Sequence, residues 1–178
     1  MLPEQRVRDV DILAPSPGLA HPGGLLAREV GIHVALAPSV TPLLSDERLA
    51  TIRDLGVKVA SLSIDGASAR THDAMRGIPG HLERSIDAIR RMRTMGFVVQ
   101  INTTVTPANV EELPAVAELL VANDANIWEV FFLVNVGRGT DLVELTPDGH
   151  EDVCQFLSDA SEYGFIVRTV EGPMFRRV

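Results

Sequence analysis

The 178-residue sequence predicts an α/β protein built on a parallel β-sheet. Apolar segments of strand length alternate along it with amphipathic segments of helix length, which is the pattern of successive βαβ units. With 46% hydrophobic and 22% charged residues, the composition is that of an ordinary globular domain with a real core. At most five strands are expected, so an open sheet or a partial barrel is predicted and a closed eight-stranded barrel is excluded.

The first segment, residues 1–24, is expected to be an irregular arm, because its Pro- and Gly-rich turns are linked by no apolar period. A single domain is expected over residues 25–178. It opens with a short helix that ends at Gly31, and a strand follows over residues 32–36.

The middle of the chain has the clearest periodicity. Ser45 is a suitable N-cap for a helix over residues 46–55, and a strand is expected over 57–64. A helix over 81–95 carries an apolar stripe made of Leu82, Ile86, Ile89 and Met92. A strand over 98–105 follows it.

The last third continues the alternation. A helix is expected over residues 110–123 and a very apolar strand over 127–134. Thr146-Pro147 supplies an N-cap and a first-turn proline for a helix that runs to about Tyr163. A final strand is predicted over 165–169.

Charge and cysteine content narrow the possible partners. The net charge of −8 argues against binding to nucleic acid or to an anionic membrane surface, since both need clustered cations. No run approaches the roughly 18 apolar residues of a membrane span, and no secretory signal is visible. The single cysteine, Cys154, excludes an internal disulfide, so a cytoplasmic location is expected.

Two predicted strands carry polar residues where a parallel sheet should be apolar. Because side chains alternate along a strand, polar groups fall on one face of each; these residues are Ser61, Ser63 and Asp65 on one strand and Gln100, Asn102 and Thr104 on the next. A polar ligand such as a ribose with an amino-acid tail would satisfy them, and so would a layer of water. Asp65 beside Gly66 at the carboxyl end of a strand favours the ligand.

Short motifs in register give a family resemblance. They are Ser63-Ile64-Asp65-Gly66, His72-Asp73-Ala74-Met75-Arg76-Gly77, Asn102-Thr103-Thr104-Val105, Leu133-Val134 with Gly137-Arg138, and the C-terminal segment from Glu171 to Val178. Over residues 25–178 the sequence resembles the radical S-adenosylmethionine (radical SAM) superfamily, in particular its SPASM-bearing enzymes that mature peptides and cofactors.

The resemblance implies a fold and a chemistry. The fold is a partial (β/α) barrel, of which this chain corresponds roughly to strands three to six. The chemistry of the intact enzyme is radical chemistry on a peptide or small molecule, dependent on S-adenosylmethionine and on a [4Fe–4S] cluster held by three closely spaced cysteines.

The resemblance also implies roles for particular residues. Ser63 and Asn102 would lie beside the adenosyl and methionyl parts of S-adenosylmethionine, and Asp65 would orient the turn above them. The backbone around Leu133 and Val134 would touch the adenine ring.

Arg76 would bind the methionine carboxylate of the same ligand, since a guanidinium binds a carboxylate bidentately. A surface salt bridge from Arg76 to Asp73 or Glu83 is the alternative. For Asp65 the alternative is an Asx-type cap of the turn after Gly66.

The departures from the family pattern set further expectations. One cysteine cannot hold the cluster, and Gly23-Gly24 is not followed by the glutamate of the family's Gly-Gly-Glu-Pro motif. We therefore expect a truncated or inactive form that lacks the cluster-binding and auxiliary-cluster regions. A cluster-free binding or scaffold protein is the alternative.

Two other sites are weaker. His150 and Cys154 share a helix face, but two ligands make no metal site, so a solvated histidine and a buried cysteine are expected. The only lysine, Lys58, falls at the start of its strand, which excludes a Schiff-base aldolase.

The exposed sheet edge at residues 32–36 predicts self-association.

Overall fold

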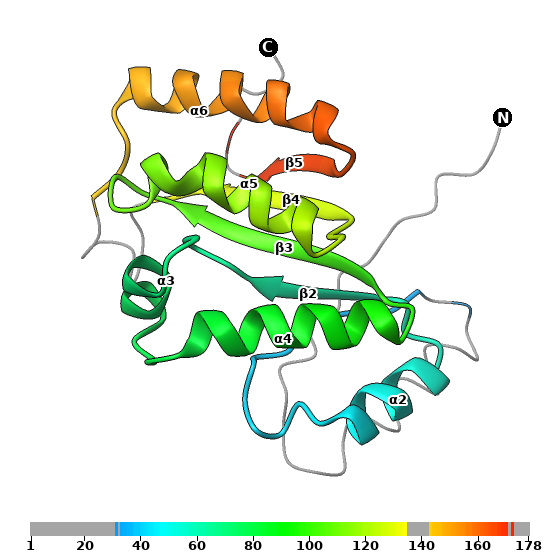
Figure 1. Ribbon diagram of the computed structural model, residues 1–178. Coiled ribbons are helices and arrows are strands. Elements are labelled where there is room, and N and C mark those ends of the chain that lie inside the picture. Colours follow the sequence, from blue (N-terminus) through cyan, green and yellow to red (C-terminus); the bar gives the residue numbers. More distant parts are fainter. Residues whose placement is uncertain (1–30, 32, 135–142, 171, 173–178) are drawn as a thin grey trace, which may run out of the picture.

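A parallel β-sheet forms the centre of the protein, and its five strands lie in the order of the sequence. The computed structural model describes residues 31, 33–134, 143–170 and 172 (Figure 1). The strands are β1 (Ala35–Leu36), β2 (Val59–Ser63), β3 (Val98–Val105), β4 (Ile127–Phe132) and β5 (Ile166–Val170). The predicted α/β class and the open parallel sheet are therefore confirmed.

Helices connect the strands and lie on one side of the sheet, with α4 and α5 in front of it in Figure 1. The helices are α2 (Asp46–Asp54), α3 (Ala69–Arg76), α4 (His81–Thr94), α5 (Leu113–Ala122) and α6 (Pro147–Ala160), with short 3₁₀ turns at Val110–Glu112 and Ser161–Tyr163. The helix-covered face of the sheet is fully buried and, apart from Thr103, apolar over the central strands, as Leu62, Ile101 and Trp128 illustrate. The hydrophobic core thus lies between the sheet and these helices.

Buried polar contacts join the three central strands. The Thr103 hydroxyl donates to the Ile64 carbonyl over 2.6 Å and accepts from the Trp128 indole N–H over 2.9 Å. Because the hydroxyl and the indole N–H are both hydrogen-bonded, these contacts offset the cost of burying them and fix the strands against one another.

The opposite face of the sheet has alternating residues that are only half-buried. Ser61 and Ser63 on β2, Gln100 and Asn102 on β3, and Glu129 on β4 all belong to this face. Among the described residues no helix packs on it, and we call it the open face.

Helix α3 is an element that the sequence analysis did not predict. Ser68 caps its N-terminus, and Gly77 ends it in the left-handed conformation at φ 68°. Its one buried residue is His72, so the segment lacks the apolar stripe by which helices are recognised.

Other predicted bounds differ from the observed ones by small amounts. The strand predicted to reach Val134 ends at Phe132, and the helix predicted from residue 110 begins as a 3₁₀ turn. The arm over residues 1–24, the short helix before Gly31, the Gly137-Arg138 motif, and Glu171 with residues 173–178 lie outside the described residues.

Candidate functional site

The polar residues of β2 and β3 lie side by side on the open face. Ser61 is the register partner of Gln100, and Ser63 is the partner of Asn102. Paired residues of neighbouring parallel strands point to the same face, so these four polar side chains share one face as predicted, whereas Asp65 is buried. All four side chains are half-buried, which leaves them accessible to a ligand.

Asp65 follows β2 directly and crosses to the neighbouring strand. Its Oδ1 accepts the backbone N–H of Thr104 over 2.9 Å, and its Oδ2 forms an ion pair with the Nη2 of Arg76. Burial raises the pKa of Asp65, although the positive charge of Arg76 and the Thr104 hydrogen bond oppose that rise. The Asx-cap alternative is wrong, because the carboxylate binds a strand rather than the turn after Gly66.

The alternative pairing of Arg76 is also wrong. Asp73 accepts the backbone N–H groups of Gly80 and Leu82 over 2.5 and 2.9 Å, so it closes the turn between α3 and α4. Arg76 pairs with Asp65 instead.

One nitrogen of Arg76 is left over in this arrangement. Its Nε is buried and has no hydrogen-bond partner among the described residues, whereas the whole side chain is 32% exposed. A buried N–H without a partner costs free energy. A ligand can reach only the exposed part of the Arg76 side chain, not this nitrogen.

Two buried histidines support the loop that carries Asp65. The backbone N–H of Asp65 donates to Nδ1 of His72 over 3.0 Å, and His72 Nε2 lies 2.9 Å from Nδ1 of His81. Both rings are buried, with His72 fully enclosed. Neither histidine has a role that is evident from the sequence, because the two meet only when α3 packs against α4.

Glu112 holds the N-terminus of α3 from a distant part of the chain. Its Oε2 accepts the backbone N–H groups of Ala67 and Ser68 over 2.9 and 3.0 Å, and its Oε1 accepts the hydroxyls of Ser68 and Thr71 over 2.9 and 2.5 Å. Burial would raise the pKa of Glu112, but these hydrogen bonds lower it overall. A Cβ on Gly66 would lie 2.8 Å from Thr71 Cγ2, so only glycine allows this close approach.

Asn109 completes the support beneath Asp65. Its Nδ2 donates to the carbonyl oxygens of Asp65 and Thr104 over 2.7 and 2.8 Å, and its Oδ1 accepts the N–H of Thr106 over 2.8 Å. Glu112 and Asn109 could not be recognised from the sequence, since both lie more than 40 residues from the loop that they hold.

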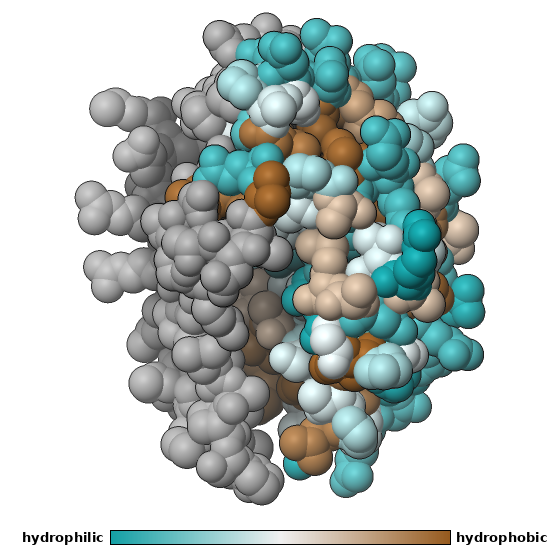
Figure 2. Space-filling view, turned by 90° about the vertical axis from the view of Figure 1, so that its left-hand side faces the viewer, coloured by the Kyte–Doolittle hydropathy of each residue, from teal (hydrophilic) through white to brown (hydrophobic). Residues whose placement is uncertain are grey.

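Leu133 and Val134 lie just beyond β4, at the same end of the sheet as Asp65. Leu133 is half-buried and Val134 is exposed. Figure 2 views the molecule from the end toward which the strands point, and small groups of hydrophobic residues are interspersed there with hydrophilic ones. Four of the six predicted site residues lie at or just beyond the carboxyl ends of β2 and β4; they are Ser63, Asp65, Leu133 and Val134. Arg76 reaches Asp65 from the end of α3, and Asn102 lies in the middle of β3 as the register partner of Ser63.

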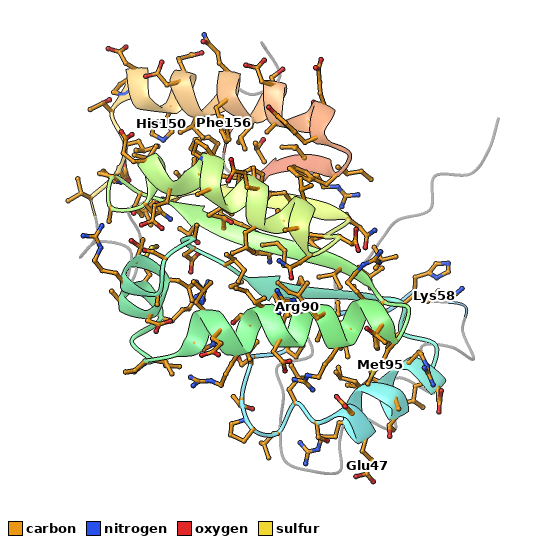
Figure 3. The ribbon with its side chains drawn as sticks, viewed as in Figure 1. Glu47, Lys58, Arg90, Met95, His150 and Phe156 are labelled. Carbon is orange, nitrogen blue, oxygen red and sulfur yellow. The ribbon has the colours of Figure 1, made fainter. Side chains whose placement is uncertain are left out.

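Lys58 lies at the opposite end of the sheet, before the first residue of β2 (Figure 3). This position agrees with the exclusion of a Schiff-base aldolase.

His150 lies at the other end of the sheet, where its ring packs against Phe132 with 5.1 Å between ring centroids. The histidine is half-buried, whereas a solvated one was expected.

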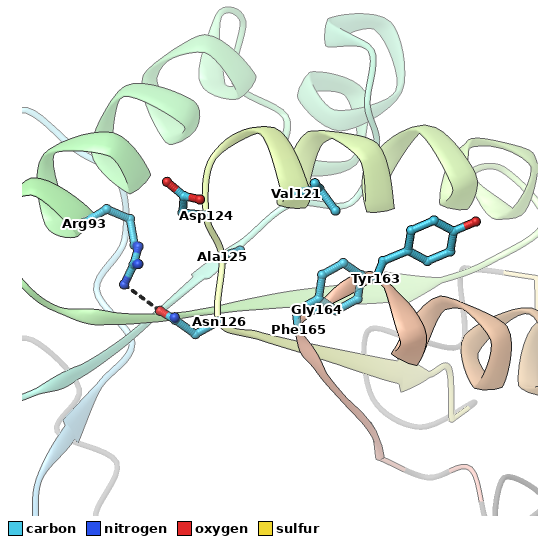
Figure 4. A pocket seen from close by; sticks show the side chains of 8 residues that line it. All are labelled: Arg93, Val121, Asp124, Ala125, Asn126, Tyr163, Gly164 and Phe165. Atoms are coloured by element: carbon cyan, nitrogen blue, oxygen red, sulfur yellow. Dashed lines mark hydrogen bonds between the residues drawn. The ribbon is translucent and has the colours of Figure 1, made fainter.

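A depression of about 210 Å³ lies at the end of the sheet where β4 and β5 begin, which is the end that holds Lys58 (Figure 4). Arg93 donates to Asn126 Oδ1 over 2.8 Å at its edge, and Phe165 and Tyr163 form another side. Parallel α/β proteins bind ligands at the carboxyl ends of their strands, so we do not place the functional site here.

The described part of the chain holds no group of three or more His, Cys, Asp or Glu side chains arranged for a metal ion. Cys154 is fully buried in α6, as expected. The set of three thiolates that a [4Fe–4S] cluster needs is not present in a sequence with one cysteine. No described helix combines the length and the apolar character needed to cross a bilayer.

Comparison with known proteins identifies the family. The model of the radical SAM superfamily matches residues 7–120, and the chain belongs to that superfamily. This result confirms the predicted family and favours it over the scaffold alternative.

Relatives within the superfamily carry more specific names. An AdoMet-dependent heme synthase of Methanosarcina barkeri is 42% identical over 129 residues, which cover 72% of this chain and 37% of the relative. A PqqA peptide cyclase of Rhodopseudomonas palustris is 34% identical over 104 residues, or 58% of this chain and 27% of the relative. The chain thus spans about a third of the length of such curated relatives.

Solved structures support the fold. A domain of the pyruvate-formate lyase-activating enzyme from Bacteroides vulgatus aligns with a TM-score of 0.65 at 17% identity, covering 88% of this chain and 96% of that one. The SuiB protein of Streptococcus suis aligns with a TM-score of 0.62 at 14% identity, covering 89% and 44%. The partial-barrel class is therefore confirmed.

Proposed function

We propose that this chain is the S-adenosylmethionine-binding part of a radical SAM enzyme, and that the ligand lies at the carboxyl ends of β2 and β3. The observations that carry the proposal are the partly exposed side chain of Arg76, held by Asp65, and the half-buried Ser63 and Asn102, which are register partners on neighbouring strands. A ligand with a carboxylate and several hydroxyl groups satisfies these groups together.

Each residue has a distinct task in this proposal. Arg76 binds the methionine carboxylate, while Asp65 neutralises the other side of the guanidinium and fixes its orientation. Ser63 and Asn102 hydrogen-bond the adenosyl and methionyl parts. The backbone at Leu133 and Val134 contacts the adenine ring.

The residues of this chain fit S-adenosylmethionine but do not fit the iron–sulfur cluster of the superfamily. In the family, the cluster supplies the electron that cleaves the bound sulfonium. We derive no such step from this chain, because one cysteine cannot supply the ligand set.

The substrate of the whole protein is proposed to be a small molecule or a peptide. The names of the relatives cover both classes, since one concerns heme and another the PqqA peptide. We also propose a cytoplasmic location and self-association through the sheet edge at β1. Light scattering of the purified chain tests the self-association.

Titration calorimetry with S-adenosylmethionine tests the binding site. Arg76→Lys keeps a positive charge opposite Asp65 but removes the planar guanidinium. We expect wild-type binding and an approximately tenfold loss in the variant, while Arg48→Lys on the exposed face of α2 leaves the affinity unchanged.

Decarboxylated S-adenosylmethionine adds a second arm to this experiment. It should bind the wild type more weakly than the intact ligand, and Arg76→Lys should cause no further loss. If wild type does not bind S-adenosylmethionine, or binds both ligands equally well, the proposed site is wrong.

A further inference from the structure

Helix α3 holds Asp65 at two points. His72 and Arg76 are four residues apart on this helix, so they share one face and lie about one turn apart. The Nδ1 of His72 accepts the backbone N–H of Asp65 over 3.0 Å, and the Arg76 guanidinium pairs with the carboxylate of the same residue. The main chain and the side chain of Asp65 are therefore both held by one helix.

Two contacts fix a direction that the ion pair alone would leave free. Glu112 holds only the first turn of α3, so without the His72 contact the last turn could shift about the link between Arg76 and Asp65. Asp65 is itself tied to the sheet, since its Oδ1 accepts the N–H of Thr104 over 2.9 Å. The exposed part of the Arg76 side chain is thus set in position relative to β3.

The contact of His72 with Asp65 requires one particular form of the imidazole ring. A backbone N–H can only donate, so Nδ1 of His72 carries no proton and its Nε2 carries one. His81, the first residue of α4, has its Nδ1 2.9 Å from that Nε2 and accepts the hydrogen bond. The hydroxyl of Ser85, one turn further along α4, lies 3.2 Å from the same Nδ1 and can also donate to it. Helix α4 therefore selects the tautomer that the contact from α3 needs.

The burial of this pair separates it from ordinary core packing. His72 is fully enclosed, and His81 and Ser85 are also buried. Apolar side chains of similar size would fill the same space without the cost of burying polar groups. A chain of directional hydrogen bonds instead fixes where each ring lies and which atom it presents to its neighbour. The polar residues at these positions thus set the direction of the contact with Asp65.

We propose that His72 and His81 are positioning residues for the S-adenosylmethionine site. His72 holds Asp65 so that Arg76 faces the carboxylate of the ligand, and His81 keeps His72 in the tautomer that this task requires. Neither histidine touches the ligand, because both rings are buried. The inference rests on the proposed function, since the group that the pair positions is the proposed partner of the ligand carboxylate.

Titration calorimetry of the whole chain with S-adenosylmethionine at neutral pH tests the inference. His72→Leu removes the acceptor for the N–H of Asp65 and should weaken binding about tenfold. His72→Asn places an amide oxygen close to the position of Nδ1, so its affinity should stay within about threefold of the wild-type value. His33→Leu changes an exposed histidine and should have no effect.

Decarboxylated S-adenosylmethionine separates a positioning role from a structural one. If His72 acts through Arg76, His72→Leu should not weaken this ligand, because it has no carboxylate to be held. In the Arg76→Lys background, His72→Leu should likewise cause little further loss for the intact ligand. His81→Leu, which frees the tautomer of His72, should also weaken only the intact ligand, by a smaller factor than His72→Leu. Urea unfolding checks that each variant folds, and His81→Leu decides the question if His72→Leu does not.

The failure of this inference can be told from the failure of the proposed function. If the wild type does not bind S-adenosylmethionine, or binds both ligands equally well, the proposed function is wrong and the inference falls with it. If the wild type prefers the intact ligand and folded His72→Leu binds it equally tightly, only the inference is overturned. Equal losses in His72→Leu and His72→Asn, or equal losses for both ligands in a folded variant, would also overturn it.

Discussion

His72 and His81 form a directional hydrogen-bonded pair with 2.9 Å between Nε2 and Nδ1 and with stacked rings 5.1 Å apart. The direction is set by the backbone N–H of Asp65, which can only donate and so requires Nδ1 of His72 to be unprotonated. His72 then donates from Nε2 to His81, which Ser85 also contacts at 3.2 Å. Both imidazoles are thus held neutral.

Acid should destabilise the protein through this pair. Burial, followed by the electrostatic interaction with His81 as that ring takes up a proton and by the positive charge of Arg76, lowers the pKa of His72 to about 4, from about 6.5 in an unfolded chain. The unfolded state therefore binds more protons between these values, so the stability contribution is complete above pH 6.5 and is lost as the pH falls toward 4. We expect a loss of about 2 to 3 kcal/mol, measured by urea unfolding at pH 7 and pH 4.5.

The variant His72→Asn provides the comparison for that experiment. It retains an acceptor for Asp65 N–H but has no titrating ring, so its stability at pH 7 should be lower and its pH profile flatter. His33→Asn changes an exposed histidine and should leave the wild-type profile intact. An equally steep profile in His72→Asn would contradict the assignment.

Removing Arg76 should expose the cost of an unpaired buried carboxylate. Arg76→Ala is expected to reduce the free energy of unfolding by about 3 to 5 kcal/mol, because Asp65 is only 3% exposed. Adding Asp65→Asn should restore part of that loss, since the amide needs no counter-charge. A double-mutant cycle in urea measures the coupling, and strictly additive effects would rule out the ion pair as the cause.

Glu112→Gln should loosen helix α3. The Glu112 carboxylate accepts hydrogen bonds from two backbone N–H groups and two hydroxyls, and the change removes its negative charge. We expect the free energy of unfolding to fall by about 1 to 3 kcal/mol. Because the pKa of Glu112 is lowered, its contribution is present above pH 4.5 and is lost as the pH falls below that value.

Hydrogen exchange over residues 66–76 measures this loosening directly. Protection there should drop in Glu112→Gln while the core strands stay protected. The adjacent, exposed Glu111 gives a matched control, and Glu111→Gln should change nothing. Equal effects of the two variants would count against a specific role for Glu112.

Thr103→Val should destabilise the sheet although it preserves shape. The valine leaves the buried indole N–H of Trp128 without its acceptor, which costs about 1 to 3 kcal/mol. Thermal unfolding measures the loss. The exposed Thr51→Val on α2 should shift the midpoint little, and a comparable shift would mean that the buried bonds are not responsible.

Several features could be predicted because they depend on local periodicity. Alternation along two strands placed Ser63 and Asn102 on one face, and the strand–helix order predicted the parallel sheet that makes them register partners. The motifs at Asp65 and Arg76 identified the superfamily. Side-chain alternation and short motifs are readable in a sequence, since they involve residues close together along the chain.

What the tertiary structure decided is which of these residues touch. Arg76 meets Asp65 rather than Asp73, His72 meets His81, and Glu112 caps a helix that begins more than 40 residues earlier. Such contacts depend on how whole helices and loops pack on the sheet, and no local pattern encodes that packing.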